Sequence, residues 1–477
     1  MNTKLLRQTI LDRAIRGLLV SQDPTDEPAS VLLERIRTEK EELIKDKKLK
    51  REKRDNQPIE EVPFEIPEGW VWCRLGEIGE IIGGGTPSTS VEEYWNGEVS
   101  WITPADLSNY SNKYIARGKR NITQLGLENS SATLIPKGGI LFSTRAPIGY
   151  VAIADKPLST NQGFKNLYPF MDISKEFIYY FLLAEKERIK LFASGTTFQE
   201  LSTSVFSKIL ISLPPLTEQH RIVQKIEQLF ALIDIIEVNK KALEKLIEQA
   251  KSQVLSDAIA GKLTHQDPND EPAEELLKRM GKTTAPDTPY EKMLPKGWAW
   301  CRLGDLTEFI RNGISIKQDK GLKGYPITRI ETISDGSINR ERMGYADIYD
   351  LSKYEQYLLT KGDILLSHIN SPIHIGKSAV YTPISISDKE KIIHGMNLLC
   401  IRLKEVDSCF INYFFNSKTF RYSLFPFIKH AVNQASINIG NLRNIYISLP
   451  PLAEQHRIVK KIETYFAAFN KIKNELI

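Results

Sequence analysis

Three short stretches of this chain resemble the glycine-rich loops that bind nucleotides. "GGGTPS" at 83–88 begins like a dinucleotide-binding loop, but Ser88 stands where the third glycine belongs and no periodic helix follows. "GKS" at 376–378 and "GKTT" at 281–284 end like a P-loop but lack its upstream glycine. Residues 83–88 are therefore interpreted as a turn whose backbone amides could cradle a phosphate, and the other two stretches predict no nucleotide site.

The residues that most often carry catalysis form no recognisable motif. The adenine-methylation pattern (D/N/S)PP(Y/F) is absent, because both pairs of prolines lie in "LPPL". The cysteines and histidines show no zinc-ligand spacing. The seven histidines are His220, His265, His368, His374, His394, His430 and His456. His220 and His456 are equivalent positions of a repeat and are interpreted as surface or capping residues. We therefore expect a non-catalytic chain that binds no metal and no cofactor.

Composition predicts a globular protein. The chain has 477 residues, 41% of them hydrophobic and 26% charged, which is room for about three domains of ordinary size. No apolar run reaches the roughly 18 residues needed to span a bilayer, and the first residues lack the apolar core of a signal peptide. We expect a cytoplasmic protein with reduced thiols at its four cysteines, Cys73, Cys301, Cys400 and Cys409. The net charge of +5 permits a nucleic-acid partner without demanding one.

Three blocks of sequence occur twice. They are "ISLPPLTEQHRIVQKIEQLF" at 211–230 and "ISLPPLAEQHRIVKKIETYF" at 447–466, "PEGWVWCRLGEI" at 67–78 and "PKGWAWCRLGDL" at 295–306, and "AIRGLLVSQDPTDEPA" at 14–29 and "AIAGKLTHQDPNDEPA" at 258–273. Their order is circular: the QDP block opens the chain and recurs in its middle, whereas the LPPL block stands in the middle and recurs at the end. We expect the termini, Met1 and Ile477, to meet, so that two halves close around a pseudo-two-fold axis.

A long helix is predicted after each LPPL block. Pro214 and Pro215 end the preceding strand, Thr217 is a favoured N-cap, and acidic and polar residues suit the first turn. Apolar residues then recur in steps of four and three, an a/d coiled-coil seam interrupted once by Lys240. The seam residues are Ile222, Ile226, Leu229, Ile233, Ile236, Leu243, Ile247, Ala250 and Val254, with Gly261 closing the helix, and in the C-terminal copy Ile458, Ile462, Tyr465, Phe469, Ile472 and Leu476. The two helices predict an antiparallel coiled coil about 60 Å long; a buried core helix is the alternative.

The remaining sequence predicts two strand-rich domains, each beginning at a GW block. We expect an α+β fold, with two mixed α/β domains joined by long helices packed as an antiparallel coiled coil. The predicted divisions are 1–60, a helical segment completing the distal helix; 61–214, the first mixed domain; 215–290, the central helical region; 291–450, the second mixed domain; and 451–477, the distal helix. Residues 34–56 are almost entirely charged and predict a solvated helix or tether. Residues 291–450 carry roughly six excess positive charges, which favours a polyanionic partner.

Taken together, the doubled LPPLxEQxRIV helix and the two unlike regions between resemble the specificity subunits of type I restriction-modification systems. The stretches at 139–167 and 195–216 also resemble that family's target-recognition domains. The resemblance implies that each mixed domain reads one half of a split sequence in double-stranded DNA. It also implies that the helices dock two methylation subunits, which carry S-adenosylmethionine, and that restriction subunits complete the nuclease. The first 60 residues depart from the simplest family pattern, since here the distal helix is divided between the chain ends.

Candidate DNA contacts follow from side-chain chemistry within these two domains. Small residues let a backbone approach phosphate, and Asn and Gln can pair with adenine through two hydrogen bonds. In the first domain the candidates are Gly84, Gly85, Thr86, Ser88, Arg145, Asn161, Gln162, Thr196 and Thr197; in the second they are Asn312, Lys317, Arg329, His368, Asn370, Asn397 and Gln434. A turn or strand-edge role is the competing interpretation for each of them. The repeated tryptophans, Trp70, Trp72, Trp298 and Trp300, are assigned to the framework.

Two other functions remain open from sequence. One is a stand-alone regulator that binds a bipartite DNA site without a catalytic partner, and the other is a fused enzyme, which the missing motifs disfavour. A docking scaffold needs apolar residues on the outer faces of its helices as well as in the seam. Val223, Phe230 and Leu232 lie off the a/d positions and so favour docking.

Overall fold

The computed structural model divides the chain into two compact units, residues 1–239 and 240–477. The structure describes residues 2–49, 58–145, 147–171, 173–194, 200–285, 293–319, 324–334, 336–371, 374–383, 391–431 and 434–475. Within these residues, no helix is both long and apolar enough to cross a bilayer. The predicted meeting of Met1 and Ile477 falls outside the described residues.

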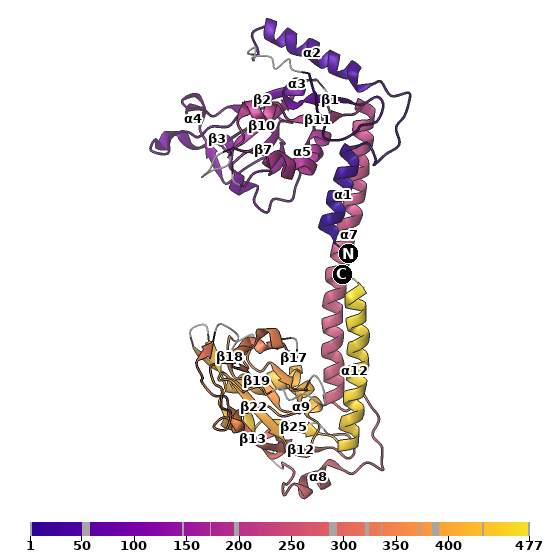
Figure 1. Ribbon diagram of the computed structural model, residues 1–477, viewed down its shortest axis with the longest axis vertical. Coiled ribbons are helices and arrows are strands. Elements are labelled where there is room, and N and C mark those ends of the chain that lie inside the picture. The colour runs from indigo at the N-terminus through magenta and orange to yellow at the C-terminus, as the bar shows by residue number, and fades with distance from the viewer. Residues whose placement is uncertain are drawn as a thin grey trace. The chain divides into compact units, whose positions relative to one another are not determined.

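The first unit is built on a five-stranded sheet (Figure 1). Its order is β2 (Gly79–Gly83), β10 (Phe164–Pro169), β7 (Ile140–Ser143), β8 (Val151–Ala154) and β4 (Tyr114–Ile115). All neighbours are antiparallel except β8 and β4, which are parallel. Both faces are buried: Ile140 and Phe142 pack into one core cluster, and Leu141 between them packs into another. The continuous apolar runs of β7 and β8 are typical of such doubly covered strands.

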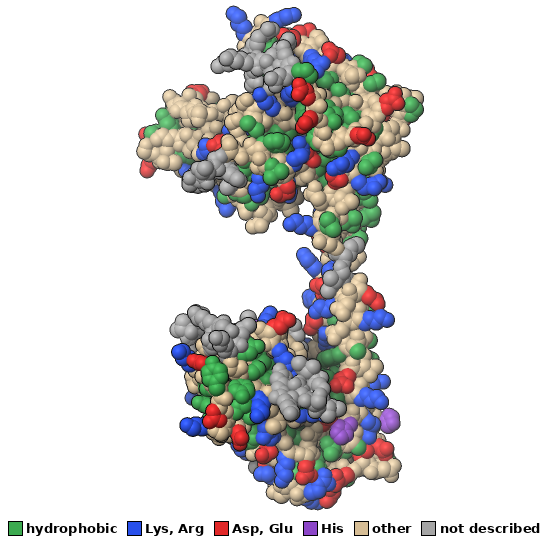
Figure 2. Space-filling view, viewed as in Figure 1, with side chains coloured by type: hydrophobic (Ala, Val, Ile, Leu, Met, Phe, Trp, Pro, Cys, Tyr) green, Lys and Arg blue, Asp and Glu red, His purple; other side chains and the backbone are tan. Residues whose placement is uncertain are grey.

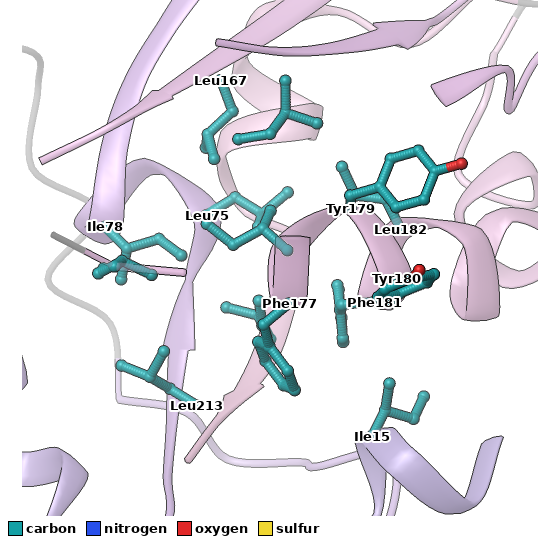
Figure 3. Packing of buried hydrophobic residues seen from close by; sticks show 14 of the residues in the cluster. Ile15, Leu75, Ile78, Leu167, Phe177, Tyr179, Tyr180, Phe181, Leu182 and Leu213 are labelled. Atoms are coloured by element: carbon teal, nitrogen blue, oxygen red, sulfur yellow. The ribbon is translucent and has the colours of Figure 1, made fainter. Parts of the chain in front are cut away.

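Helix α5 (Lys175–Lys190) covers one face of this sheet. Ser174 caps it by accepting a hydrogen bond from the Phe177 amide, and basic residues occupy the last turn, as the helix dipole favours. Figure 3 shows Phe177 and Phe181 of α5 in a cluster with Leu167 of β10 and with Ile15 near the N-terminus. Burying one such phenylalanine contributes about 1.5–3 kcal/mol.

A second, four-stranded sheet completes the first mixed domain. Its order is β5 (Arg120–Ile122), β3 (Trp95–Ile102), β9 (Leu158–Thr160) and β6 (Leu134–Ile135), and the short helices beside it are η1 (Glu92–Tyr94), η2 (Pro104–Asp106) and α4 (Gln124–Glu128). The Arg120 guanidinium lies 3.7 Å from the centre of the Trp95 ring, and Trp101 packs edge-on against Trp95.

The second unit repeats the core of the first. Its main sheet has the order β13 (Thr307–Asn312), β22 (Leu398–Leu403), β19 (Ile364–Ser367) and β21 (Ser378–Val380), all antiparallel. This is the order of β2, β10, β7 and β8 in the first unit. Ile364 and Leu366 again face one cluster while Leu365 faces another, and α9 (Ser408–Phe415) takes the place of α5.

The second unit also has smaller elements, and only some of their pairings repeat those of the first unit, such as the parallel bridge of Ile327 with Ile393, which matches that of Trp101 with Ser159. These elements are a three-stranded sheet of β14 (Gln318–Asp319), β18 (Gly344–Ala346) and β15 (Tyr325–Ile327), another of β20 (Ile369–Asn370), β24 (Gln434–Ser436) and β23 (Lys429–Ala431), the pair β16 (Ile333–Ser334) and β17 (Ser337–Ile338), the helices η4 (Ile330–Thr332), η5 (Arg340–Arg342), η6 (Glu355–Tyr357) and η7 (Phe425–Phe427), and α10 (Lys418–Leu424). The two mixed domains therefore share a frame and differ in what is attached to it.

A two-stranded sheet closes each mixed domain. In the first unit β1 (Val71–Arg74) pairs antiparallel with β11 (Leu210–Leu213), and in the second β12 (Ala299–Arg302) pairs with β25 (Tyr446–Leu449) in the same register. Short helices flank them: α3 (Leu75–Ile78), α6 (Thr203–Ser207), η3 (Leu303–Leu306) and α11 (Ile439–Arg443). Two prolines then end β11 and β25, and a long helix starts after each pair, as predicted.

The predicted long helices are α7 (Leu216–Ile259) and α12 (Leu452–Glu475). The α7 seam is buried at Ile222, Ile226, Ile233 and Ile247, but Ile236 is 39% exposed. Gly261 follows the helix with φ near +70°, the left-handed conformation that ends many helices. Thr217 is not the N-cap, since the helix already starts at Leu216; the Thr217 hydroxyl instead bonds to the Asp26 carboxylate.

Helices near the termini pack on the long helices within each unit. Arg7 of α1 (Thr3–Ile15) forms an ion pair of 2.6 Å with Asp234 and stacks over Phe230 of α7. In the second unit, Lys251 of α7 donates to Asn470 of α12 at 3.0 Å and lies over Phe466. The remaining helices are α2 (Ala29–Lys45) and α8 (Ala273–Arg279).

The structure tests the predicted orientation of three apolar residues of α7. Val223 and Phe230 pack against the core of the first unit, so their predicted outward orientation was wrong, whereas Leu232 is 56% exposed.

The charged segment forms α2 up to Lys45, and Leu32, Leu33 and Ile36 bury one face of this helix. All four cysteines are free, and burial raises the pKa of Cys409 to about 11.

Candidate nucleic-acid interface

Three of the predicted residues line one cleft of about 530 Å³ in the first unit. Arg145 follows β7, and Asn161 and Gln162 follow β9, so the ends of these two strands bring them together. Thr103, Ser108 and Tyr150 also line the cleft. A guanidinium, two carboxamides and several hydroxyls are the groups that contact phosphates and base edges in protein–DNA interfaces.

Glu200 positions Arg145 at the edge of this cleft. The Glu200 carboxylate lies 2.9 Å from Arg145 Nε, and its other oxygen lies 3.6 Å from Lys165 Nζ. A backbone bridge also joins Arg145 to Glu200. The Arg145 side chain stays 46% exposed, so it is both held and accessible.

The glycine-rich turn serves close packing of backbone segments. A Cβ atom on Gly84 would lie 1.9 Å from the Asn161 carbonyl oxygen, and one on Gly85 would lie 2.2 Å from the backbone of Ser131. The two amides donate to the carbonyls of Phe164 and Thr160. They therefore do not form the phosphate-binding nest that the sequence suggested.

The hydroxyls beside this turn have partners within the domain. Thr86 donates to the side-chain oxygen of Gln162, which ties the turn to the cleft, and the Ser88 and Ser90 hydroxyls lie 2.8 Å apart. Thr196 and Thr197 lie outside the described residues, so their predicted role stays a prediction.

The second unit gathers predicted residues at the corresponding corner of its main sheet. His368 follows β19, and Asn397 precedes β22 with φ of +71°. The Asn397 backbone raises the pKa of the His368 imidazole, against the larger lowering that burial causes. Gly313, next to Asn312, packs on Gly395 so closely that a Cβ would lie 2.0 Å from its carbonyl oxygen. Three loops therefore meet here, as three chain segments do around the cleft of the first unit.

Two of these residues are less available than the sequence suggested. His368 is only 7% exposed, and its burial lowers the pKa of the imidazole, so it lies inside the domain as a neutral side chain. The Asn370 amide donates to the Ser367 hydroxyl at 3.2 Å and its carbonyl accepts from the Ser371 amide at 2.7 Å, which is a turn-forming role. Asn312 is exposed at the end of β13.

The remaining candidates of the second unit lie on other elements. Lys317 is exposed and directly precedes β14. Arg329 follows β15 and donates from Nε to the Gln318 side-chain oxygen at 2.6 Å. Gln434 begins β24, but its side chain lies outside the described part. Figure 2 shows basic and acidic side chains interspersed over the visible face of each unit.

All three repeated blocks contribute to a buried hydrogen-bonded joint that was not predicted from the sequence. Glu218 in the first turn of α7 is 1% exposed. It accepts hydrogen bonds from the Trp70 indole at 2.9 Å and from the Gln22 amide at 3.1 Å. Burial raises the pKa of Glu218, and these two hydrogen bonds oppose that shift. The acidic first turn was interpreted through the helix dipole, but here the carboxylate serves tertiary contacts.

The neighbour of this glutamate ties the same turn to the mixed domain. Gln219 is fully buried, accepts from the backbone amide of Ser174, which caps α5, and donates to the Pro214 carbonyl. One turn further on, Arg221 forms two hydrogen bonds to the Asp26 carboxylate at 3.2 and 2.6 Å, and this contact lowers the pKa of Asp26.

The second unit contains the same joint. Glu454 accepts from the Trp298 indole at 2.9 Å and from the Gln266 amide at 3.0 Å. Gln455 accepts from the amide of Asp407, the cap of α9, and Arg457 pairs with Asp270 at 3.2 and 2.5 Å. The recurrence of these residue types in all three blocks is the signal that could have revealed the joint. His220 and His456, next to the buried pairs, are exposed.

Within the described residues, no group of three or more His, Cys, Asp or Glu side chains could hold a metal ion. The arrangement offers donors and acceptors at two exposed corners and buried polar contacts at two joints.

Comparison with known proteins identifies this frame. The family model described as the type I restriction modification DNA specificity domain matches residues 67–245 and 295–477. The chain is 30% identical over 424 residues to the type I restriction enzyme MjaIX specificity subunit of Methanocaldococcus jannaschii, which covers 86% of this chain and 89% of that protein. It is 29% identical to the EcoAI specificity subunit of Escherichia coli, over 98% of this chain and 90% of that one.

A solved structure agrees at the level of the fold. The HsdS subunit from Thermoanaerobacter tengcongensis superposes with a TM-score of 0.53 at 20% identity, over 87% of this chain and 93% of that one. The repeated mixed domains and the long helix are therefore a known architecture. Because the family model covers most of the chain and matches it twice, this protein belongs to the type I restriction-modification DNA specificity family, as the resemblance predicted.

Proposed function

We propose that this chain reads a bipartite DNA target for a type I restriction-modification complex, with one mixed domain for each half of the target. The observation that carries this proposal is a shared frame with two unlike surfaces. Strand order and joint recur in both units. At the corner where Arg145, Asn161 and Gln162 line a cleft in the first unit, the second unit has His368, Asn370 and Asn397.

In the first unit we assign base reading to Arg145 and Gln162. An arginine can donate two parallel hydrogen bonds to guanine in the major groove, and a glutamine can pair with adenine. The ion pair with Glu200 supports this role for Arg145, because it holds an exposed side chain in one direction. Ser88, which is exposed at the edge of the turn, is assigned to a phosphate contact, while the Thr86 hydroxyl orients the Gln162 side chain. In the second unit Asn312 and Lys317 are the accessible candidates.

The long helices are proposed to act as the spacer between the two readers. We infer that α1 and α12 together form the second strand of an antiparallel coiled coil along α7, with a pseudo-two-fold relation between the halves. The contacts of Arg7 with Asp234 and of Lys251 with Asn470 support this within each unit. A rigid spacer between two readers demands half-sites at a fixed separation, as in dimeric DNA-binding proteins.

The outer face of α7 is proposed to dock methylation subunits. Leu232, Ile235 and Val238 are 56%, 56% and 64% exposed, and clustered exposed apolar side chains are typical of protein interfaces. A stand-alone regulator would need only the buried seam, so these residues favour docking.

The methylation subunits would carry S-adenosylmethionine, restriction subunits would complete the complex, and this chain would catalyse nothing. We place the complex in the cytoplasm, where free thiols such as Cys73 persist.

Co-expression with a methylation subunit of a type I restriction-modification system tests this proposal. The methylated adenines of the host DNA, read by sequencing, should define two half-sequences with a constant spacer. Exchanging residues 80–205 for those of another family member should change one half-sequence and leave the spacer and the other half unchanged. If the exchange changes both halves, or if no bipartite methylated sequence arises, the proposal is wrong.

A single substitution sharpens the test. Arg145→Gln should reduce discrimination at one or two base pairs of the half-site read by the first unit, because it removes the guanidinium that can donate two parallel hydrogen bonds to guanine. Arg35→Gln is the matched control, since Arg35 is also a half-exposed arginine of the first unit paired with a glutamate, Glu27. Equal effects of the two variants would contradict the assignment of Arg145.

A further inference from the structure

We propose that Glu218 and Glu454 are positioning residues: each belongs to a joint that holds its recognition domain at a fixed angle to the long helix and thereby sets the half-site spacing. This inference rests on the proposed function. It concerns how the reader is held, which is separate from what the reader contacts.

The joint connects three segments that the chain brings together from far apart. Gln22 lies after α1, Trp70 directly precedes the first strand of the mixed domain, and Glu218 lies in the first turn of α7. Trp70 and Gln22 are 148 and 196 residues from Glu218 in sequence. The Trp70 ring also packs edge-on against Phe177 of α5, so the indole links the domain core to the helix.

The kind of contact matters for holding an angle. Apolar packing is non-directional, whereas a hydrogen bond weakens steeply when its angle departs from linear. Leaving the Glu218 carboxylate buried without donors would be costly, so rotating the domain away from α7 is opposed by the loss of both bonds. Gln219 accepts a further hydrogen bond from the Ser174 amide. Glu218 therefore links α7 to the residue before β1, and Gln219 links α7 to the start of helix α5.

The ion pair between Arg221 and Asp26, beside the joint, fixes the segment between α1 and α2. Arg221 and Asp26 share two parallel hydrogen bonds, a geometry that adds orientation to attraction. In addition, the Ser212 hydroxyl donates to the carbonyl of Ile15, the last residue of α1, at 2.6 Å. The helices, the two-stranded sheet and the mixed domain therefore meet at one polar centre.

Repetition separates this role from DNA reading. The second unit has the same donors and acceptors at Glu454, Trp298, Gln266, Arg457 and Asp270. Its Ser448 hydroxyl likewise donates to the Ile259 carbonyl, the last residue of α7. The reading corners differ between the units whereas the joints do not, so the joints serve a task common to both readers, which is their placement.

The test uses the complex with methylation subunits and a set of targets whose spacer is native, one base pair shorter or one base pair longer. The measurement is the ratio of the methylation rate on the native spacer to that on the altered spacers. Arg221→Asp should lower this ratio about tenfold, the factor that 1.4 kcal/mol represents, because a loosened domain tolerates the wrong spacing. The double variant Asp26→Arg with Arg221→Asp should restore it by recreating the pair with reversed polarity. Arg457→Asp should act in the same way through the second unit.

A structural role alone predicts a different pattern. Phe181→Leu removes core volume from the recognition domain and should lower the rate on all targets together, leaving the ratio unchanged. If Arg221→Asp fails to fold, Glu218→Gln decides, because it keeps the size of the side chain and replaces one accepting oxygen by a donor that faces Gln22. A wild-type complex without any spacer preference would contradict the proposed function. A wild-type complex with a spacer preference that neither variant relaxes would overturn the inference and leave the proposed function intact.

Discussion

Replacing Trp70 by phenylalanine should destabilise the first unit by about 2–4 kcal/mol. The indole donates to the buried Glu218 carboxylate at 2.9 Å, and a hydrogen bond to a charged group contributes about 1.5–3 kcal/mol. The smaller ring adds a packing loss, since Trp70 is only 8% exposed. The variant leaves the carboxylate with the Gln22 amide as its remaining side-chain donor among the residues described.

The loss should depend on pH in a defined direction. Burial raises the pKa of Glu218 above its ordinary value of 4.5, and the Trp70 hydrogen bond opposes that rise. A carboxyl with a raised folded-state pKa contributes stability below the unfolded pKa, and that contribution is lost as the pH rises through the folded pKa. Trp70→Phe raises the folded pKa further. The difference in stability between variant and wild type should therefore be smallest near pH 4.5 and grow towards pH 8.

Hydrogen exchange in urea, read by mass spectrometry, measures the two units separately. Peptides from α5 report the first unit, and peptides from α9 serve as an internal reference that should not change. Trp72→Phe is the matched control: among the described residues no partner accepts a hydrogen bond from its buried indole nitrogen, so it should cost less than about 1 kcal/mol. Equal losses for the two variants, or a loss independent of pH, would refute the assignment of Glu218 as a buried acceptor.

Three further outcomes are expected. The purified chain alone should transfer no methyl group from S-adenosylmethionine to DNA in a radiolabel assay that the co-expressed complex passes; methylation by the pure chain would make it an enzyme. Leu232→Asp with Ile235→Asp should abolish co-purification of the methylation subunit at unchanged helicity, whereas Gln224→Asp, at an exposed polar position of α7, should not; retention by the double variant would exclude that face. Inserting four residues after Leu243 lengthens α7 by about 6 Å, which should add one or two base pairs of about 3.4 Å to the spacer; a changed half-sequence would show that helix and readers are not independent.

Local signals account for what the sequence predicted correctly. The prolines before Leu216 and Leu452, the steps of four and three, and Gly261 depend on residues within a turn or two of each other, so α7 and α12 follow from pattern alone. The circular repeat likewise predicted two mixed domains on a common frame. Of the site, chemistry and spacing selected Arg145, Asn161 and Gln162, which the fold brings into one cleft.

Tertiary structure decided the rest, because it sets which residues are buried and which partners they meet. Gly84 and Gly85 suggested a phosphate site, but close approach of neighbouring backbone explains them. His368 suggested a DNA contact, but it is buried. Phe230 lies off the seam and was taken as outward-facing, yet it packs on Tyr180 of α5.

The joint is the clearest case of this division. The sequence by itself determined that a glutamate and a glutamine would follow each LPPL, that a tryptophan would open each mixed domain, and that a helix would carry the first pair. Whether the carboxylate of Glu218 faces solvent or the Trp70 indole depends on a segment 148 residues away. Helix propensity and capping act over one turn of chain, whereas the burial of a charge and the donors that compensate it are properties of the assembled fold.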